Sequence, residues 1–193
     1  AGWLPAQVVG GEFEVSDTFD GPVSWEGFAY STAGAGDVDN DGVPDVIVGS
    51  YIEDVGGVHD IGTADVFSGA DGSLIHHWDG IDEDGIFGVA VAGVGDINHD
   101  GHDDVIVGAQ YEDVGAMSYA GAAYVFSGID GSLIHKFVGE YSSSYFGGAV
   151  ASAGYVNADR TPDIIVGAWN CNNGTFYDSG AAYIYSGADG SLI

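Results

Sequence analysis

The chain repeats itself three times with a fixed step, and this regularity constrains its fold more than any other feature. The segment VFSGADGSLI begins at Val66. It returns as VFSGIDGSLI at Val125 and as IYSGADGSLI at Ile184, a step of 59 residues in each case. Each unit is therefore expected to form one structural module that buries its apolar surface against its neighbours.

The second unit shows the pattern within one module. Residues 87–95 (FGVAVAGVG) are small, apolar and alternating, and residues 104–110 (DVIVGAQ) form a continuous apolar run, as in a strand buried on both faces. An Asp-Gly turn, which is typical of a hairpin, lies between residues 122–128 and the more polar residues 132–139. Four strands without helical periodicity predict the blade of a β-propeller, with the Gly/Ala-rich strand innermost. A β-solenoid is the alternative.

The predicted organisation is all-β, with three four-stranded blades of 59-residue period and a spare N-terminal outer strand. The segment 1–21 holds the spare strand, the first two blades occupy 22–80 and 81–139, and a third blade at 140–193 has an incomplete outer strand. Propellers close into rings of about four to eight blades, so three blades leave exposed edges. We expect that other copies or other chains complete the ring, or that the chain is part of a longer propeller.

The charge of the chain excludes several classes of partner. The formal net charge is −28, and Lys136 and Arg160 are the only lysine and arginine. Such a field repels nucleic acid and anionic membranes and attracts divalent cations. No apolar run approaches the roughly 20 residues that cross a bilayer.

Cys171 cannot form an intramolecular disulfide, which leaves a lone loop thiol or an intermolecular bridge.

Each unit carries an acidic loop between its first two strands. In the first loop, DVDNDGVPD, aspartates occupy positions 1, 3, 5 and 9, the glycine at position 6 permits a sharp turn, and position 7 offers its backbone carbonyl. Hard oxygen ligands in a flexible loop suit calcium, which takes about six to eight of them. An EF-hand needs Glu at position 12, where this loop has valine. The predicted first calcium site comprises Asp37, Asp39, Asp41, Asp45 and the Val43 carbonyl.

The other two loops have fewer carboxylates among their potential calcium ligands than the first. The predicted second site comprises Asp96, Asn98, Asp100, Asp104 and the His102 carbonyl. With one charge fewer, it is expected to bind calcium slightly more weakly. The third loop offers Asn157, Asp159, Thr161 and Asp163. Because Tyr155 replaces the first carboxylate and Arg160 replaces the turn glycine, we expect this site to be weak or empty, with the arginine partly substituting for the metal.

The order of these features resembles the FG-GAP repeat. Phe87-Gly88 opens the second unit and Gly108-Ala109-Gln110 follows its apolar strand, while Phe146-Gly147 and Gly167-Ala168-Trp169 match in the third. The first unit departs, with Phe28-Ala29, and the expected proline of the last motif is missing in all three units. The resemblance implies calcium-binding propeller blades, as in integrin α-subunits and many secreted microbial proteins, and hence an extracellular location.

No sequence motif for a catalytic nucleophile, a zinc protease or a nucleotide-binding loop is present. The acidic pairs Glu53-Asp54 and Glu112-Asp113 are either solvated loop residues or groups for acid–base chemistry and sugar binding. The histidines of the outer strands and of the second acidic loop are expected to be exposed: His76, His77, His135, His99 and His102. Aromatic residues on loops predict a glycan or protein contact surface: Tyr51, Tyr111, Trp169, Phe176 and Tyr177.

These observations favour a non-enzymatic, extracellular module for adhesion, for binding a protein or glycan, or for assembly into a larger structure. The alternative is the propeller part of a calcium-dependent polysaccharide lyase or of another carbohydrate-active enzyme. A lyase must bind an acidic substrate, and a chain with two fixed cations and a net charge of −28 repels one.

Overall fold

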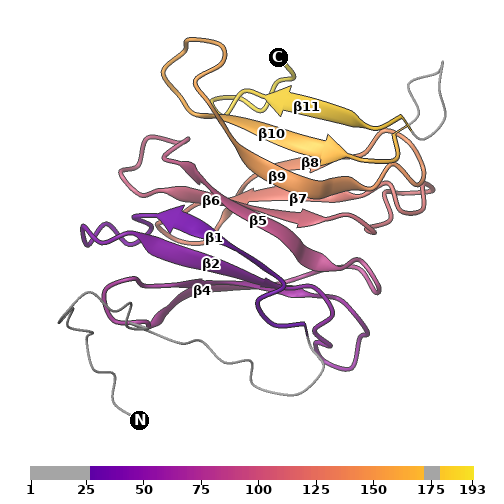
Figure 1. Cartoon of the computed structure of the whole chain (residues 1–193), viewed down its shortest axis with the longest axis horizontal. Coiled ribbons are helices and arrows are strands. Elements are labelled where there is room, and N and C mark those ends of the chain that lie inside the picture. Colours follow the sequence, from indigo (N-terminus) through magenta and orange to yellow (C-terminus); the bar gives the residue numbers. More distant parts are fainter. Residues whose placement is uncertain (1–26, 172–178) are drawn as a thin grey trace, which may run out of the picture.

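The computed structural model describes residues 27–171 and 179–193, and this part of the chain contains strands, turns and loops without a helix (Figure 1). The first sheet contains β1 (Ser31–Gly36), β2 (Asp45–Ser50), β3 (Thr63–Phe67) and β4 (Leu74–Asp79). The second contains β5 (Phe87–Gly95), β6 (Asp104–Ala109), β7 (Ala122–Phe126) and β8 (Leu133–Val138). The third contains β9 (Phe146–Gly154), β10 (Asp163–Ala168) and β11 (Ala181–Tyr185).

All three sheets are antiparallel, and their strands follow one another in sequence order. The predicted all-β class is confirmed, and the sheets stack in chain order as successive propeller blades do (Figure 1). Two sheets have four strands, whereas the third has three among the described residues. The spare outer strand predicted within residues 12–21 lies outside the described residues.

The first strand of each sheet lies against the first strand of the next, so β1, β5 and β9 are neighbours along the stack. These strands are rich in glycine and alanine because their backbones approach closely. A Cβ atom added to Gly93 of β5 would lie 2.7 Å from the carbonyl oxygen of Ala35 in β1. The prediction that crowding selects small residues in this strand therefore has a direct geometric basis.

Two apolar cores hold the stack together, one at each junction between sheets. The first joins the first two sheets through residues such as Ile47, Val66 and Phe87. The second joins the second and third sheets through Ile106, Phe146 and others. Phe146 is only 1% exposed, so its truncation to alanine is expected to destabilise the fold by about 3–5 kcal/mol.

Two histidines of the outer strands, His76 and His135, are half-buried bridges between sheets, which corrects the prediction that they are exposed, whereas His77 is exposed as predicted. His76 of β4 donates from Nε2 to the carbonyl of Gly128 at 2.6 Å, and His135 of β8 donates to the carbonyl of Gly187 at 3.1 Å. Each imidazole thus reaches the tight turn of the following unit. The period of the repeat makes this contact recur, since both pairs are separated by 52 residues.

Candidate metal centres

The first acidic loop brings together three of its four predicted carboxylates. Oxygen atoms of Asp37, Asp39 and Asp45 all lie within 4.8 Å of one another, and this is the only such acidic group in the described part of the chain. Asp41 is not part of the group; its Oδ1 accepts a hydrogen bond from the Val43 N–H at 2.7 Å. The loop therefore presents a compact set of hard oxygen donors to one point, as a divalent cation requires.

One oxygen of this set has no partner within the protein. Asp37 Oδ1 is buried and makes no hydrogen bond to any described residue, whereas Asp37 Oδ2 accepts the Gly42 N–H at 3.1 Å. A buried carboxylate oxygen left without a partner is costly unless a cation or water satisfies it. Partial desolvation raises the pKa of Asp39, and the charges of Asp45, Asp41 and Asp37 raise it further against an opposing hydrogen bond from the Asp41 N–H. Both features fit a site built for a cation.

The ninth position of each loop forms a buried frame that the sequence did not reveal. Asp45 is 1% exposed; its Oδ2 accepts the Val38 N–H at 2.7 Å and its Oδ1 accepts the Gly69 N–H at 3.0 Å. The equivalent Asp104 and Asp163 accept the corresponding N–H groups in the second and third loops. This carboxylate therefore ties the acidic loop to the turn after the third strand, whatever else it binds.

The second loop keeps the frame, but its other groups bond to one another. Asn98 donates to Asp100 Oδ2 at 2.8 Å, and Ser127 donates to the same oxygen at 3.2 Å. Although burial opposes it, these bonds and one from the His102 N–H hold the pKa of Asp100 below its usual range. Burial raises the pKa of Asp104 to about 6, with a contribution from the charges of Asp100 and Asp96.

The third loop folds in the same way without a convergent acidic set. Asn157 donates to Asp159 Oδ2 at 2.7 Å, and Asp163 is fully buried in its frame. Tyr155 is 67% exposed and so does not fill the place of the first carboxylate. Arg160 makes no ion pair with a carboxylate of the described residues, so the suggestion that its charge replaces the metal is wrong for this geometry.

Neighbouring loops are hydrogen-bonded to one another. The Asp37 N–H donates to Asp103 Oδ2 at 2.9 Å, and His102 donates from Nδ1 to the Val38 carbonyl at 2.7 Å. His99 meets the Thr161 hydroxyl of the third loop at 3.0 Å. The two histidines of the second loop thus link the three loops into a row; His99 is also exposed, as predicted, whereas His102 is half-buried.

The acidic residue after β6 has a structural role, and neither function suggested by its sequence position applies. Glu112 is 4% exposed, accepts a hydrogen bond from the Tyr124 hydroxyl at 2.5 Å and pairs with Lys136 at 2.7 Å. Lys136 also lies 4.8 Å from the centroid of the Tyr124 ring. Because both oxygens are engaged and enclosed, Glu112 is not free for acid–base chemistry or for a sugar hydroxyl.

Cys171 is a free thiol in a loop, which agrees with the first of the two expectations, and it is buried. Its Sγ lies 3.3 Å from the hydroxyl of Tyr183, and that contact raises the tyrosine pKa, with burial as the second cause. At 3% exposure, the thiol could reach another chain only after local opening.

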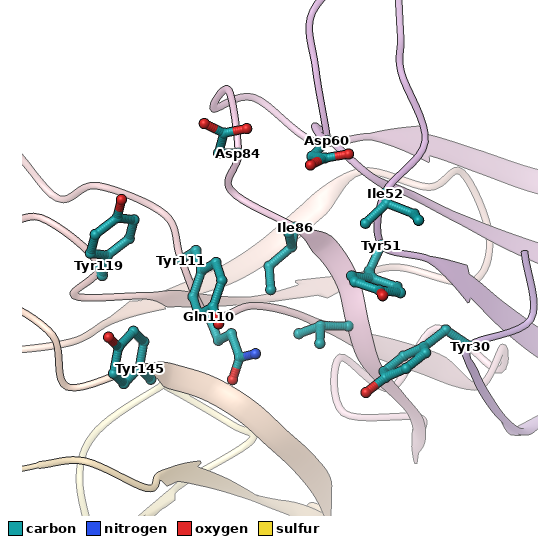
Figure 2. Close-up of a pocket in the computed structure, with 11 residues that line it drawn as sticks. Tyr30, Tyr51, Ile52, Asp60, Asp84, Ile86, Gln110, Tyr111, Tyr119 and Tyr145 are labelled. Atoms are coloured by element: carbon teal, nitrogen blue, oxygen red, sulfur yellow. The ribbon is translucent and has the colours of Figure 1, made fainter. Parts of the chain in front are cut away.

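Two of the predicted contact aromatics, Tyr51 and Tyr111, line a cavity of about 590 Å³ at the opposite ends of the strands from the acidic loops (Figure 2). A third, Trp169, stacks on Tyr145 of that cavity with ring centroids 4.6 Å apart. Phe176 and Tyr177 lie outside the described residues. The sequence reasoning missed the other lining groups: Tyr30, Ile52, Asp60, Asp84, Ile86, Val89, Gln110, Tyr119 and Tyr145. Their recurrence at 59-residue steps, such as Ile86 and Tyr145 or Asp60 and Tyr119, is the signal that could have found them.

Among residues 27–171 and 179–193, no helix combines the length and the apolar character that a membrane span needs.

The fold and the loops define a class: stacked antiparallel blades whose first hairpin carries an acidic loop. Comparison with known sequences shows what the chain resembles. The FG-GAP repeat profile matches residues 87–126. The chain is 34% identical over 161 residues to integrin alpha pat-2 of Caenorhabditis briggsae, which covers 71% of this chain. It is 32% identical over 160 residues to human integrin alpha-6 and 29% identical over 180 residues to integrin alpha-5 of Xenopus laevis, covering 78% and 86% of this chain.

The matched regions span only 13%, 13% and 17% of the length of these three relatives. The second unit thus matches the FG-GAP repeat, and the chain is similar to part of integrin α-subunits.

Proposed function

We propose that the chain is a calcium-binding β-propeller segment of an extracellular, non-enzymatic adhesion module. The observation that carries this proposal is the convergence of Asp37, Asp39 and Asp45 around a buried oxygen that no described residue satisfies. Calcium would be held there by these carboxylates, with Asp41 and the Val43 carbonyl completing the first site. The cation would neutralise the loop and fix its conformation.

The second site is proposed at the carboxylates of the second loop, with the Asn98 and His102 carbonyl oxygens. Calcium binding there would require Asn98 and Asp100 to exchange their mutual hydrogen bond for the cation, so we expect weaker binding than at the first loop. The third loop is proposed to bind weakly or not at all, because it lacks the first carboxylate. These differences predict stepwise occupation of the row of loops.

The proposed extracellular location is supported by the relatives and by the chemistry of the loops. The relatives are integrin α-subunits, and extracellular calcium modules bind at about 0.1–1 mM, which suits loops with one or two exposed carboxylates. The acidic surface argues against nucleic acid and for a protein or glycan partner. The stack of blades also needs further blades, which we propose are supplied by other chains or by further parts of a longer protein.

A non-catalytic role is supported by the state of the candidate acid–base groups. Glu112 is enclosed in an ion pair with Lys136, and His77 is bonded between Asp65 at 2.6 Å and Asp79 at 3.0 Å. Partial burial of His77 lowers its pKa, but the two carboxylates outweigh it and raise the pKa overall. These groups stabilise sheets instead of facing a cavity with a nucleophile.

Calcium titration of the metal-free chain tests the proposal. We expect calorimetry to show stepwise binding, with the tighter event lost in the Asp37→Asn variant, and the melting temperature to rise with calcium because only the folded loops bind it. At a calcium concentration of 100 times Kd, the stabilisation is about 2.7 kcal/mol. An unchanged melting temperature at 10 mM calcium would contradict the proposed function.

Light scattering with calcium and with excess chelator addresses the ring. A multimer that dissociates on chelation would show that copies of this chain complete one another. A monomer under both conditions would assign the missing blades to other parts of a longer protein or to different chains.

A further inference from the structure

The cavity at the end of the strands opposite the acidic loops is an aromatic pocket with a polar edge. It has a volume of about 590 Å³ and lies where the first two sheets meet, with Tyr145 contributed by the third unit (Figure 2). Tyr51 and Ile52 follow β2, Gln110 and Tyr111 follow β6, and Tyr30 precedes β1. The size falls within the range of about 300–1,000 Å³ that is typical of small-molecule sites.

Five tyrosine rings form two opposing walls. Tyr30 and Tyr51 lie on one side with ring centroids 4.3 Å apart. On the other side Tyr111 lies 5.6 Å from Tyr119 and 5.4 Å from Tyr145 (Figure 2). None of the five hydroxyls bonds to another described residue, and Tyr30 and Tyr119 are 63% and 45% exposed. A concentration of amphipathic, accessible rings in one hollow is a feature of recognition sites.

The backbone of the pocket holds large side chains in a conformation that favours glycine. Ile86 and Tyr145 have φ of 50° and 54°, and the equivalent residue of the first unit is Gly27 at 62°. A β-branched residue in this region is a strained outlier. The second and third units therefore accept backbone strain at a position whose side chain lines the pocket, and such strain concentrates at functional sites.

The edge of the pocket is rigid because its loops are bonded to each other. The Asp84 N–H donates to the His59 carbonyl and the Ile86 N–H donates to the Asp60 carbonyl, each at 3.1 Å. Across the pocket the Tyr145 N–H donates to the Tyr119 carbonyl at 3.2 Å. The walls are thus preorganised, which lowers the entropic cost of binding a ligand.

The polar groups of the pocket define the charge of its ligand. Asp60 and Asp84 lie together at one edge, and Gln110 lies on the other side with its Oε1 held by the Trp169 indole N–H at 3.2 Å (Figure 2). That contact leaves the amide NH₂ of Gln110 as a donor. No lysine or arginine lines the cavity, and the chain carries a net charge of −28, so an anionic ligand is excluded.

We infer that this pocket binds a neutral saccharide, which rests on the proposed function as a binding module and names its ligand class. The tyrosine faces would stack on the C–H faces of a sugar ring, the two carboxylates would accept from adjacent hydroxyls, and Gln110 would donate to a ring or hydroxyl oxygen. A quaternary ammonium group is less suited, because it needs rings within about 6 Å on several sides. Here the rings form two separate walls around a cavity of about 590 Å³, a size typical of small-molecule sites.

The test is a binding screen by saturation-transfer NMR and calorimetry on the whole 193-residue chain in calcium. The probes are methyl β-galactoside, methyl α-mannoside, methyl β-N-acetylglucosaminide and lactose, with glucuronate and tetramethylammonium chloride as charged controls. We expect at least one neutral probe to bind with a Kd of about 1 mM or tighter, and neither charged probe to bind as well. Preferential binding of glucuronate or tetramethylammonium would overturn the assignment of the ligand class.

Variants locate the site. Tyr111→Ala and Tyr30→Ala, made separately, are each expected to raise the Kd of the saccharide about tenfold, because each removes one stacking face. Asp84→Asn should weaken it less, and Tyr141→Ala, an exposed tyrosine outside the pocket, should leave it unchanged. Equal affinity in the wild type, Tyr111→Ala and Tyr30→Ala would overturn the site. If no neutral probe binds while calcium still stabilises the chain, the inference fails and the proposed calcium module stands.

Discussion

The first and third acidic loops share one backbone frame and differ in the groups that would face a cation. In both, the aspartate at the ninth position is buried and accepts the N–H of the second position and of the glycine in a later turn. Only the first loop adds convergent carboxylates at positions 1 and 3, whereas the third has Tyr155 and Asn157 there. The ninth aspartate holds the loop together in both cases, and the carboxylates at positions 1 and 3 are what the proposed site adds to it.

The largest expected effect comes from removing the frame in each loop. Asp163→Ala leaves the N–H groups of Val156, Asn157 and Gly187 without this acceptor, and the bond to Gly187 is buried. At about 1–3 kcal/mol for each unsatisfied group, partly relieved by water, we expect a loss of roughly 3 kcal/mol in urea unfolding. The loss should be the same with and without calcium.

Asp45→Ala is the matched change in the first loop. It should cost a similar amount in metal-free protein and more in calcium, because it removes both the frame and a ligand. Equal losses for Asp45→Ala under both conditions would show that the ninth aspartate of the first loop does not contact the cation.

The next largest effect separates the site from the frame within one loop. Asp37→Asn keeps the size of the side chain and removes its charge. The stability of the metal-free protein should therefore change little or rise slightly, because repulsion among the carboxylates falls. In calcium we expect the variant to lose most of the ligand-dependent stabilisation, about 1.5–2.5 kcal/mol at saturating calcium.

Asn157→Ala in the third loop is the control, and its effect should not depend on calcium. A calcium response of Asp37→Asn equal to that of the wild type would refute the assignment of Asp37 as a ligand.

The strands and acidic loops could be predicted from the sequence because their signals are local and repeated. Residues 87–95 were predicted as an inner strand and form β5 with the same bounds, and β6 ends one residue before the predicted end at Gln110. The loop frame could not be predicted, since the acceptor at Asp45 meets its second donor, Gly69, 24 residues later. That contact depends on how the ends of two hairpins meet in space.

The tyrosine pocket escaped prediction for a different reason. Its residues come from the turns before the inner strands and from the loops after the second strands, and they recur at the 59-residue step with changed side chains, such as Ile86 and Tyr145. Ile86 also has a positive φ, which β-branched residues rarely adopt. Local propensity therefore did not predict the observed turn. Glu112 and His76 were misjudged because their partners belong to distant segments of the fold.

The second loop provides an intermediate effect, which depends on pH. Burial raises the pKa of Asp104 to about 6, above its value in an unfolded chain. The folded metal-free protein therefore retains a proton between about pH 4 and 6 that the unfolded chain releases, so its stability falls as the pH rises through this interval. Bound calcium favours the carboxylate and should cancel the fall.

We expect the stabilisation by calcium to grow by about 1–2 kcal/mol between pH 5 and 7, after allowance for solvent screening. Thermal unfolding of metal-free and calcium-saturated protein across this range is the measurement. Parallel pH profiles for the two forms would exclude the coupling of Asp104 to the cation.

The smallest effect, and the sharpest use of the comparison, is to give the third loop what the first one has. Tyr155→Asp restores the first carboxylate, and Arg160→Gly replaces a residue at φ of 74° with the residue that the first loop carries at 91°. The frame around Asp163 is already in place, so the double variant should bind one more calcium ion in calorimetry than the wild type. Arg160→Gly alone should relieve backbone strain, a gain of about 0.5–1 kcal/mol, without adding a site. If the double variant binds no additional calcium, the residues at positions 1 and 6 do not explain the difference in calcium binding between the loops. The difference would then be assigned to position 3, where the third loop has Asn157 and the first loop has Asp39.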